Sequence, residues 1–247
     1  MAFVVIGNYL SPYVRKVLAC MELKGLGYEI DPIVPFMGNE AFARLSPLRR
    51  IPLLLHDGRV LLDSSVICQY LEDIQPTPPL YPADPVDRAH ARWLEEYADT
   101  ALADALIWRL FYQKAIRPYV FGEERDEAVI GETLERHIPR ALDYLETQLP
   151  ADGYLFGALS VADVAIASMF RTAAFVRFAI DATRWPRSAA FVERALAHEA
   201  FRKLARLEDV MLRLPVSEQR AALAAAGAPL TTETFGTSAP RHGLPRM

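Results

Sequence analysis

The feature that most constrains the fold is a short apolar run at residues 3–6, followed closely by a Ser-Pro pair. Four aromatic or β-branched side chains in succession predict a strand that is buried on both faces. Ser11 predicts a helix N-cap, and Pro12 suits the first helical position, where its missing N–H costs nothing. Because a helix start carries unpaired N–H groups and the positive pole of the helix dipole, this one favours an anion.

The residues up to about 75 predict a small α/β domain with a mixed sheet. Asp57-Gly58 between two apolar runs is a strong hairpin signal. The prolines at 32 and 35 indicate that the second strand is short or lies at an edge. The predicted elements after the first helix are a strand within 28–34, a helical turn at 39–45, a hairpin of 51–56 and 59–62, and a helix starting at Asp63-Ser64.

Beyond this domain the strand signals stop. Four prolines within residues 75–83 predict a stiff linker and a domain boundary. The fold class is therefore α/β plus all-α. We expect a first domain at 1–77, a linker at 78–84, an all-helical domain at 85–214 and a C-terminal tail at 215–247. Within the second domain the pattern predicts helices over 85–116, 123–149 with a kink or split at Pro139, 160–180, and 186–214 with a break near His198. For the tail, the sequence predicts at most a short helix, followed by a poorly ordered or surface-draped segment.

Composition excludes several classes of function. The 247 residues carry a net charge of -4 and no long basic block, so nucleic acid is not an expected partner. The most apolar later segment, 161–180, contains three charged residues, so we expect no membrane span and a cytoplasmic protein. Cys20 and Cys68 are far apart in sequence, and neither a disulfide framework nor a metal site is expected. The scattered histidines predict surface or packing roles rather than ligands; they are His56, His90, His137, His198 and His242.

This order of elements and motifs resembles the glutathione S-transferase family. The resemblance rests on Ser11-Pro12, Ile51-Pro52 and Asp63-Ser64 in their contexts, and on a helix cap at Ser160 with Asp163 in the second domain. It covers about residues 1 to 214 and leaves the tail unexplained. It implies a thioredoxin-like first domain that binds glutathione as co-substrate, an electrophile pocket against the helical domain, a role in detoxification and a homodimer.

The resemblance also implies roles for particular residues. Ser11 matches the hydroxyl that faces the glutathione sulfur in serine-type classes. Ile51 matches the residue whose backbone pairs with the cysteinyl unit, before a proline, here Pro52, that the family holds cis. Asp63 and Ser64 match the residues that hold the γ-glutamyl amine and carboxylate, although many relatives have Glu or Gln where Asp63 stands. Either Arg49 or Arg50 would meet the glycyl carboxylate.

The chemistry requires a site that favours a thiolate. A free thiol has a pKa of about 8.5, and lowering it by two units requires about 2.7 kcal/mol of preference for the anion. A hydroxyl donor supplies about 1.5–3 kcal/mol and a helix N-terminus about 0.3–2 kcal/mol, so Ser11 suffices. Tyr9 is the competing hydroxyl, because other classes of the family use a tyrosine near the end of the first strand.

Each motif also has a purely structural interpretation. Ser11 and Asp63-Ser64 could be helix caps alone, and the two arginines could be solvated loop residues. Aromatic side chains at helical spacing could line the electrophile pocket or belong to the core; these are Trp108, Phe111 and Tyr112.

The leading hypothesis is a glutathione transferase that acts on an electrophilic small molecule. The same thiolate could serve dehalogenation, isomerisation or peroxide reduction, and the fold also serves as a non-catalytic binding or assembly module. Cys20 lies too far into its helix for a glutaredoxin-like thiol transferase. A serine hydrolase is disfavoured because the chain has no Gly-x-Ser-x-Gly elbow.

Overall fold

The chain forms two compact units in a computed structural model that describes residues 3–212 and 214–240. Unit 1 comprises the chain up to Pro78 together with the chain from Arg202 onward, and unit 2 comprises the residues between them. The end of the predicted tail, including His242, lies outside the described residues.

The units divide the chain at two points. The first boundary falls between Pro78 and Pro79, inside the predicted linker. The second lies at residue 201 rather than at 214. The reason is visible in unit 1, where Glu208 forms an ion pair with Arg15 and both side chains are 1% exposed. The residues after 201 therefore contribute to the core of the first unit.

Unit 1 is built on a four-stranded mixed sheet with the order β2-β1-β3-β4, which confirms the predicted fold class. The parallel pair is β1 with β2, while β3 lies antiparallel to both β1 and β4. At the centre Val5 lies opposite Ile30 on one side and Leu54 on the other. The strands are β1 (Phe3–Ile6), β2 (Tyr28–Asp31), β3 (Leu53–His56) and β4 (Arg59–Leu62).

Local chemistry explains the limits of these strands. The β2 strand ends at Asp31 because Pro32 has no N–H to donate. It is an edge strand, as its prolines predict. In the β3–β4 hairpin, Asp57 and Gly58 have φ values of 51° and 73°, as a tight turn matched to the twist of the strands requires.

Side-chain caps begin several of the helices of unit 1. Ser11 is the N-cap of α1, Pro12 follows at the first helical position, and Gly25 ends the helix with φ 65°. Asn39 caps α2 by accepting a bond from the backbone N–H of Phe42 at 2.9 Å. The helices are α1 (Pro12–Lys24), η1 (Pro35–Met37), α2 (Glu40–Leu45), α3 (Ser64–Ile74), α9 (Glu199–Met211, which begins in unit 2) and α10 (Val216–Ala225).

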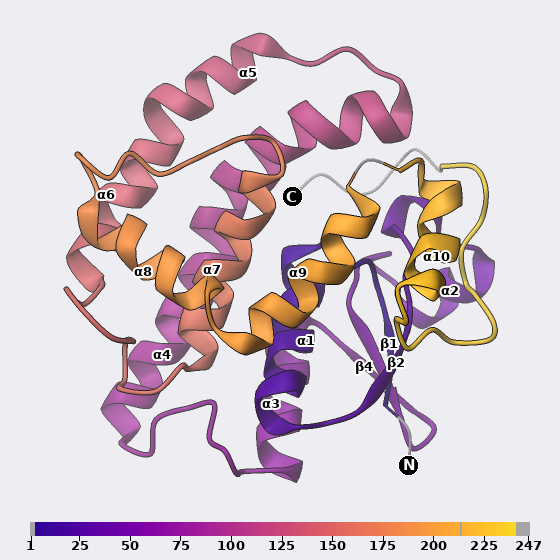
Figure 1. The fold of residues 1–247 in the computed structure, drawn as a ribbon, viewed down its shortest axis with the longest axis horizontal. Helices are drawn as coiled ribbons and strands as arrows, with labels where there is room; N and C mark the ends of the chain where they lie inside the picture. Colours follow the sequence, from indigo (N-terminus) through magenta and orange to yellow (C-terminus); the bar gives the residue numbers. More distant parts are fainter. Residues whose placement is uncertain (1–2, 213, 241–247) are drawn as a thin grey trace. The chain divides into compact units, whose positions relative to one another are not determined.

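The segment after α10 follows the surface of unit 1, close to α2 in Figure 1. Ile30 of the edge strand β2 donates its backbone N–H to Pro229 O at 2.8 Å and accepts a bond from Thr231 N at 3.1 Å. Further along, Asn39 N donates to Phe235 O at 2.8 Å. As far as the structure describes it, the tail is therefore surface-draped and covers the open edge of the sheet.

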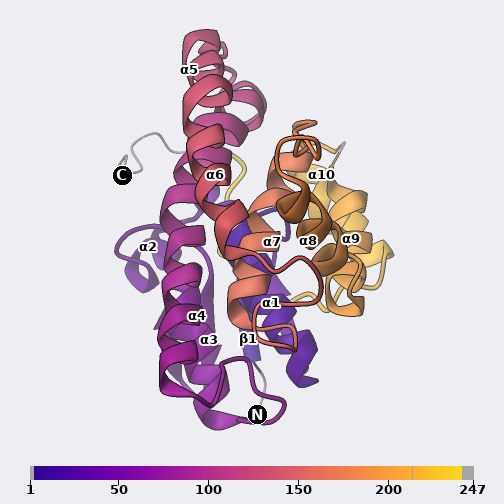
Figure 2. The same ribbon diagram turned by 90° about the vertical axis from the view of Figure 1, so that its left-hand side faces the viewer.

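Unit 2 is all helical, as predicted. Its central helix is α7, which is buried along nearly its whole length and packs against η2, α4 and α8 (Figure 2). A capping box of Ser160 and Asp163 starts α7, as the sequence indicates. The elements are α4 (Pro85–Tyr97), η2 (Ala98–Phe121), α5 (Glu127–Glu132), η3 (Thr133–His137), α6 (Ile138–Gln148), α7 (Val161–Ala174) and α8 (Pro186–Leu196).

Two predicted helix ends were wrong. The helix expected to end near residue 116 continues through Pro118 to Phe121, in the element η2. The helix expected to reach residue 180 ends at Ala174, where Phe178 N donates back to Ala173 O and Arg177 takes a left-handed φ of 63°. The break predicted near His198 is confirmed between α8 and α9.

Glu146 on α6 supplies the cap that α8 lacks in its own sequence. Its carboxylate accepts bonds from Arg187 N at 2.8 Å, Ser188 N at 2.9 Å and Ser188 Oγ at 2.7 Å. Burial acts to raise the pKa of Glu146, but these bonds, that of Ser188 foremost, outweigh it and lower the pKa. The ionised carboxylate therefore stabilises the native state of unit 2.

We expect Glu146→Gln to lower the free energy of unfolding by about 1 kcal/mol at neutral pH, because an ionised acceptor is replaced by a neutral one. Since the native pKa is depressed, this stabilisation is complete above pH 4.5 and is lost as the pH falls through the native pKa. Denaturant titrations of both proteins should therefore converge in acid. A difference that is the same at every pH would contradict this assignment.

No helix within residues 3–212 and 214–240 is long and apolar enough to cross a membrane. In the same described residues no group of three or more His, Cys, Asp or Glu side chains could hold a metal ion.

Candidate functional site

The loop between β1 and α1 is shaped by Asn8, a residue that the sequence analysis did not single out. Its backbone carbonyl accepts a bond from Ser11 N at 3.0 Å, and its side-chain Oδ1 accepts one from Leu10 N at 2.9 Å. Ser11 Oγ accepts a bond from Val14 N at 3.4 Å, as an N-cap does. An Asn that directly follows a Gly is the available signal, because Asn side chains bond the backbone two residues on in turns.

Gly7 brings this loop against the segment that contains Pro52. A Cβ on Gly7 would stand 2.4 Å from Val14 Cγ2 and 3.3 Å from Ile51 Cβ, so only glycine allows the approach. The Ile51-Pro52 peptide bond is cis. The segment that leads into Ser11 and the segment of Ile51-Pro52 are therefore in contact.

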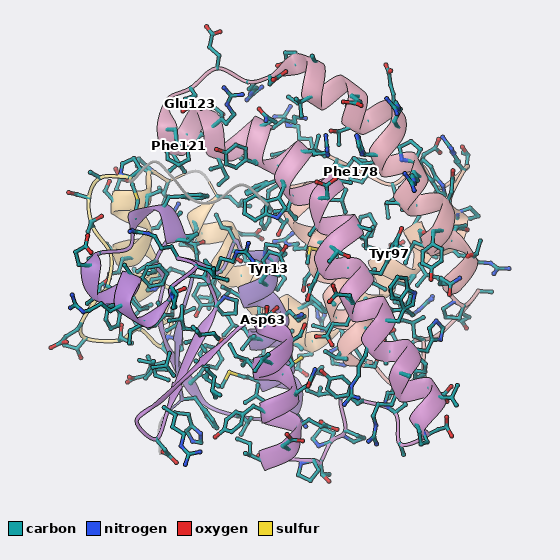
Figure 3. The ribbon with its side chains drawn as sticks, turned by 180° about the vertical axis from the view of Figure 1, so that it is seen from behind. Tyr13, Asp63, Tyr97, Phe121, Glu123 and Phe178 are labelled. Carbon is teal, nitrogen blue, oxygen red and sulfur yellow. The ribbon has the colours of Figure 1, made fainter. Side chains whose placement is uncertain are left out.

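The third predicted segment begins at Asp63, the N-cap of α3. Its Oδ1 accepts bonds from Ser65 N at 2.8 Å and from Val66 N at 3.3 Å, and Ser64 beside it is 3% exposed. Asp63 has φ 74°, which is unfavourable for a non-glycine residue and is typical of functional sites. Figure 3 labels Asp63 and, on the first turn of α1, Tyr13, a partly buried tyrosine that the sequence analysis did not consider.

Helices α1 and α3 lie parallel, so they begin at the same end of unit 1. Their contacts advance together along both helices: Lys16 Nζ donates to Ser65 Oγ at 2.9 Å, and Lys24 Nζ donates to Glu72 Oε2 at 2.7 Å. Between these contacts the sulfur atoms of the two cysteines are 3.6 Å apart. Two helix N-termini, each the positive end of a helix dipole, thus lie at the same end of unit 1, the end at which strand β1 finishes.

The Tyr9 hydroxyl does not lie beside these two helix N-termini. Tyr9 is 1% exposed, and burial raises the pKa of its hydroxyl far above the ordinary value, an effect that the Tyr28 hydroxyl only partly offsets. Its electrostatic neighbours are Tyr28, which pairs with Phe3 at the beginning of β1, and Glu22, which is three turns beyond Ser11 in α1. The Tyr9 hydroxyl therefore lies toward the opposite end of the unit from the start of α1.

The two arginines differ in their surroundings. Arg49 has φ 50° and is partly buried, and its Nη2 donates to Gly38 O at 2.9 Å. Arg50 is exposed, and its backbone is held by Ser46, whose Oγ accepts from Arg50 N and donates to Arg50 O at 3.0 Å each.

The three aromatic candidates all lie on η2 in unit 2. Trp108 is 36% exposed, and its ring centroid lies 6.4 Å from that of Tyr112. Phe111 is partly buried and meets Phe175 edge-on at 6.5 Å. Phe111 thus takes part in the packing of the unit, and Trp108 is the most accessible of the three.

Two family models match separate parts of the chain. Residues 5–79 match the model described as glutathione S-transferase, N-terminal domain, and residues 107–199 match that of the C-terminal domain. Glutathione S-transferase U8 of Arabidopsis thaliana is 30% identical over 169 residues, covering 67% of this chain and 68% of the relative. Maleylacetoacetate isomerase of Pseudomonas aeruginosa is 29% identical over 202 residues, covering 79% of this chain and 92% of the relative.

Among solved structures, a glutathione S-transferase from Rhodospirillum rubrum F11 has a similar fold, with a TM-score of 0.78 and 23% sequence identity. The match covers 89% of this chain and 99% of that one.

Proposed function

This chain belongs to the glutathione S-transferase family, and we propose that it binds glutathione in unit 1 and activates its thiol for attack on an electrophilic small molecule. The observation that carries the proposal is the parallel packing of α1 and α3, which places Ser11 and the Asp63-Ser64 pair at one edge of the unit. Glutathione has a thiol in the middle and charged groups at both ends, so it needs one group near the thiol and separate groups near the charged ends.

In this proposal each end of glutathione has its own partner. Asp63 takes the γ-glutamyl ammonium, because its carboxylate is exposed at the tip of α3. Ser64 and the positive pole of α3 take the neighbouring carboxylate. We assign the glycyl carboxylate to Arg50 rather than Arg49, because Arg49 is turned toward the carbonyl of Gly38. The backbone of Ile51, before the cis Pro52, would pair with the cysteinyl unit.

Ser11 is the proposed activating group. Its Oγ is only weakly engaged by Val14 N at 3.4 Å, and as an acceptor there it keeps its own proton available for donation. A hydroxyl that donates to the thiolate, at the positive pole of α1, favours the ionised thiol. Water or a general base outside this site can then take the released proton.

Tyr9→Phe should leave turnover and the affinity for glutathione unchanged within about twofold, because the hydroxyl that it removes is buried near Tyr28 and away from Ser11. Tyr13→Phe is the companion variant, since Tyr13 lies two residues after Ser11, in the first turn of α1. Steady-state kinetics of both variants with one electrophile check the assignment. A loss of tenfold or more in Tyr9→Phe alone would transfer the activating role to Tyr9.

A second candidate reaction is glutathione-dependent isomerisation. It is favoured by the relative from Pseudomonas aeruginosa, whose printed name is maleylacetoacetate isomerase and which is matched over 92% of its length. In that reaction the thiolate adds to the substrate and later leaves, so the same Ser11 and α3 groups are required. Dehalogenation and peroxide reduction are further uses of the same thiolate.

The test has two steps. The protein is first passed over immobilised glutathione and eluted with free glutathione, and is then assayed with an aromatic halide, a cis-unsaturated dicarboxylate and a hydroperoxide. Retention with conjugation supports the proposal, and retention with cis–trans conversion alone supports the isomerase. Retention without any turnover would indicate a binding module, and failure to bind glutathione would refute the proposal. The homodimer and the cytoplasmic location implied by the family stay predictions.

A further inference from the structure

The C-terminal part of unit 1 contacts the loop that leads into Ser11. We propose that α9 and α10 brace this loop through Glu208 and Gln219, and so position the Ser11 hydroxyl for thiol activation. This inference rests on the proposed function of Ser11. Through Gln219 it also assigns a role in the site to the tail, which the resemblance to the family leaves unexplained.

The first brace is a buried ion pair. Arg15 Nε donates to Glu208 Oε1, and Arg15 Nη2 reaches Tyr9 O at 3.4 Å. Arg15 lies in the first turn of α1, where its backbone N–H donates to Ser11 O at 2.9 Å. Glu208 therefore fixes a guanidinium that holds the loop at Tyr9 and belongs to the same helical turn as Ser11.

The second brace is an amide pair between the loop and α10. Asn8 Nδ2 donates to Gln219 Oε1 at 3.4 Å, and Gln219 Nε2 donates to Leu214 O at 3.2 Å. Asn8 and Gln219 are 5% and 7% exposed. Because Asn8 also accepts the N–H groups of Leu10 and Ser11, its orientation sets the path of the backbone into α1.

The helix α10 is itself anchored firmly to the sheet. The buried carboxylate of Asp31, at the end of β2, accepts bonds from Arg220 Nη1 at 3.0 Å, Thr234 Oγ1 at 2.8 Å and Phe235 N at 2.7 Å. Arg220 is the neighbour of Gln219 on α10 and also donates from Nη2 to Thr231 O. A helix that is fixed in this way can hold the Asn8 side chain in one orientation.

The mechanism of the brace follows from the directionality of hydrogen bonds. A hydroxyl donor loses much of its effect on a thiolate when it moves by a few tenths of an ångström or turns away from the sulfur. Gln219 and Glu208 touch neither Ser11 nor the proposed ligand, so they are positioning residues.

The main variant is Gln219→Leu, which keeps the side chain's size and removes the amide that faces Asn8. Leu223→Ala is the matched control on the same helix: Leu223 is fully buried, so the substitution removes apolar packing from α10 and keeps both amide side chains of the contact between Asn8 and Gln219. Glu208→Gln tests the first brace, since it keeps the side chain's size and removes the negative charge that pairs with Arg15. The readout is the ultraviolet absorbance of bound thiolate as a function of pH, together with kcat, KM and thermal unfolding.

We expect Gln219→Leu to raise the pKa of the bound thiol by about one unit and to lower kcat about tenfold at neutral pH, with KM for glutathione changed less than about threefold. Leu223→Ala should lower the unfolding midpoint and leave the thiol pKa unchanged. An unchanged thiol pKa in both Gln219→Leu and Glu208→Gln would overturn the inference, as would an equal shift in Leu223→Ala. If the wild-type protein binds glutathione with an unshifted thiol pKa, or does not bind it, the proposed function itself fails.

Discussion

Ser11→Gly is expected to keep the fold and to lose most of the activity. The loss follows from the strength of one hydrogen bond: a hydroxyl that donates to a charged acceptor contributes about 1.5–3 kcal/mol, which corresponds to about a 10- to 150-fold decrease in kcat/KM. The helix start should tolerate the change, because replacing a serine N-cap by glycine costs only a few tenths of a kcal/mol. In this structure the cap bond at stake is the long one from Val14 N.

Three measurements separate the catalytic role of Ser11 from its role as a cap. The unfolding midpoint of Ser11→Gly should stay close to that of the wild type, and its retention on immobilised glutathione should persist. The absorbance of bound thiolate at neutral pH should disappear. Ser11→Thr, which keeps both a hydroxyl and a capping oxygen, should retain part of the activity. Unchanged turnover in Ser11→Gly would exclude this serine as the activating group.

The largest expected effect on stability is that of Asp163→Ala in unit 2. The carboxylate of Asp163 is completely buried; it accepts bonds from Leu155 N at 2.9 Å, from Ser160 N at 2.8 Å and from the Ser160 hydroxyl. Burial raises the pKa of Asp163 despite these bonds. Alanine would leave one buried and one partly buried backbone N–H group without an acceptor, so we expect a loss of about 2–5 kcal/mol, a large part of a typical domain's stability.

The position of Asp163 makes this loss important for the whole unit. It lies at the start of α7, the helix against which α4, η2 and α8 pack. Denaturant unfolding of Asp163→Ala should show a lower midpoint. Expression of the variant at 37 °C should give a reduced yield of soluble protein. Asp163→Asn keeps one acceptor oxygen and should lose less. Asp104→Ala removes an exposed partner of Arg109 and is the control, with a change below about 1 kcal/mol. Equal losses in Asp163→Ala and Asp104→Ala would contradict the capping role.

The sequence by itself determined the elements whose signals are local. Ser11-Pro12, Asp57-Gly58 and the Ser160 capping box each act over three or four residues, so the chain's own bonds decide the cap or turn. The alternation of strand and helix signals in the first 75 residues and their absence later were enough for the fold class. The order of the motifs was enough for the resemblance to the family.

Only the tertiary structure decided which side chains meet. Tyr9 and Ser11 are two residues apart and both carry a hydroxyl, but packing buries Tyr9 beside Tyr28 and leaves Ser11 at the helix tip. Gln219 contacts Asn8 in the loop before Ser11, and Glu208 contacts Arg15 in the first turn of α1. Each partner is more than 190 positions away, and no local pattern encodes such a contact. Long-range pairing depends on how the sheet and helices pack as a whole, and this is why the unit boundary at residue 201 and the bracing of the Ser11 loop became visible only in three dimensions.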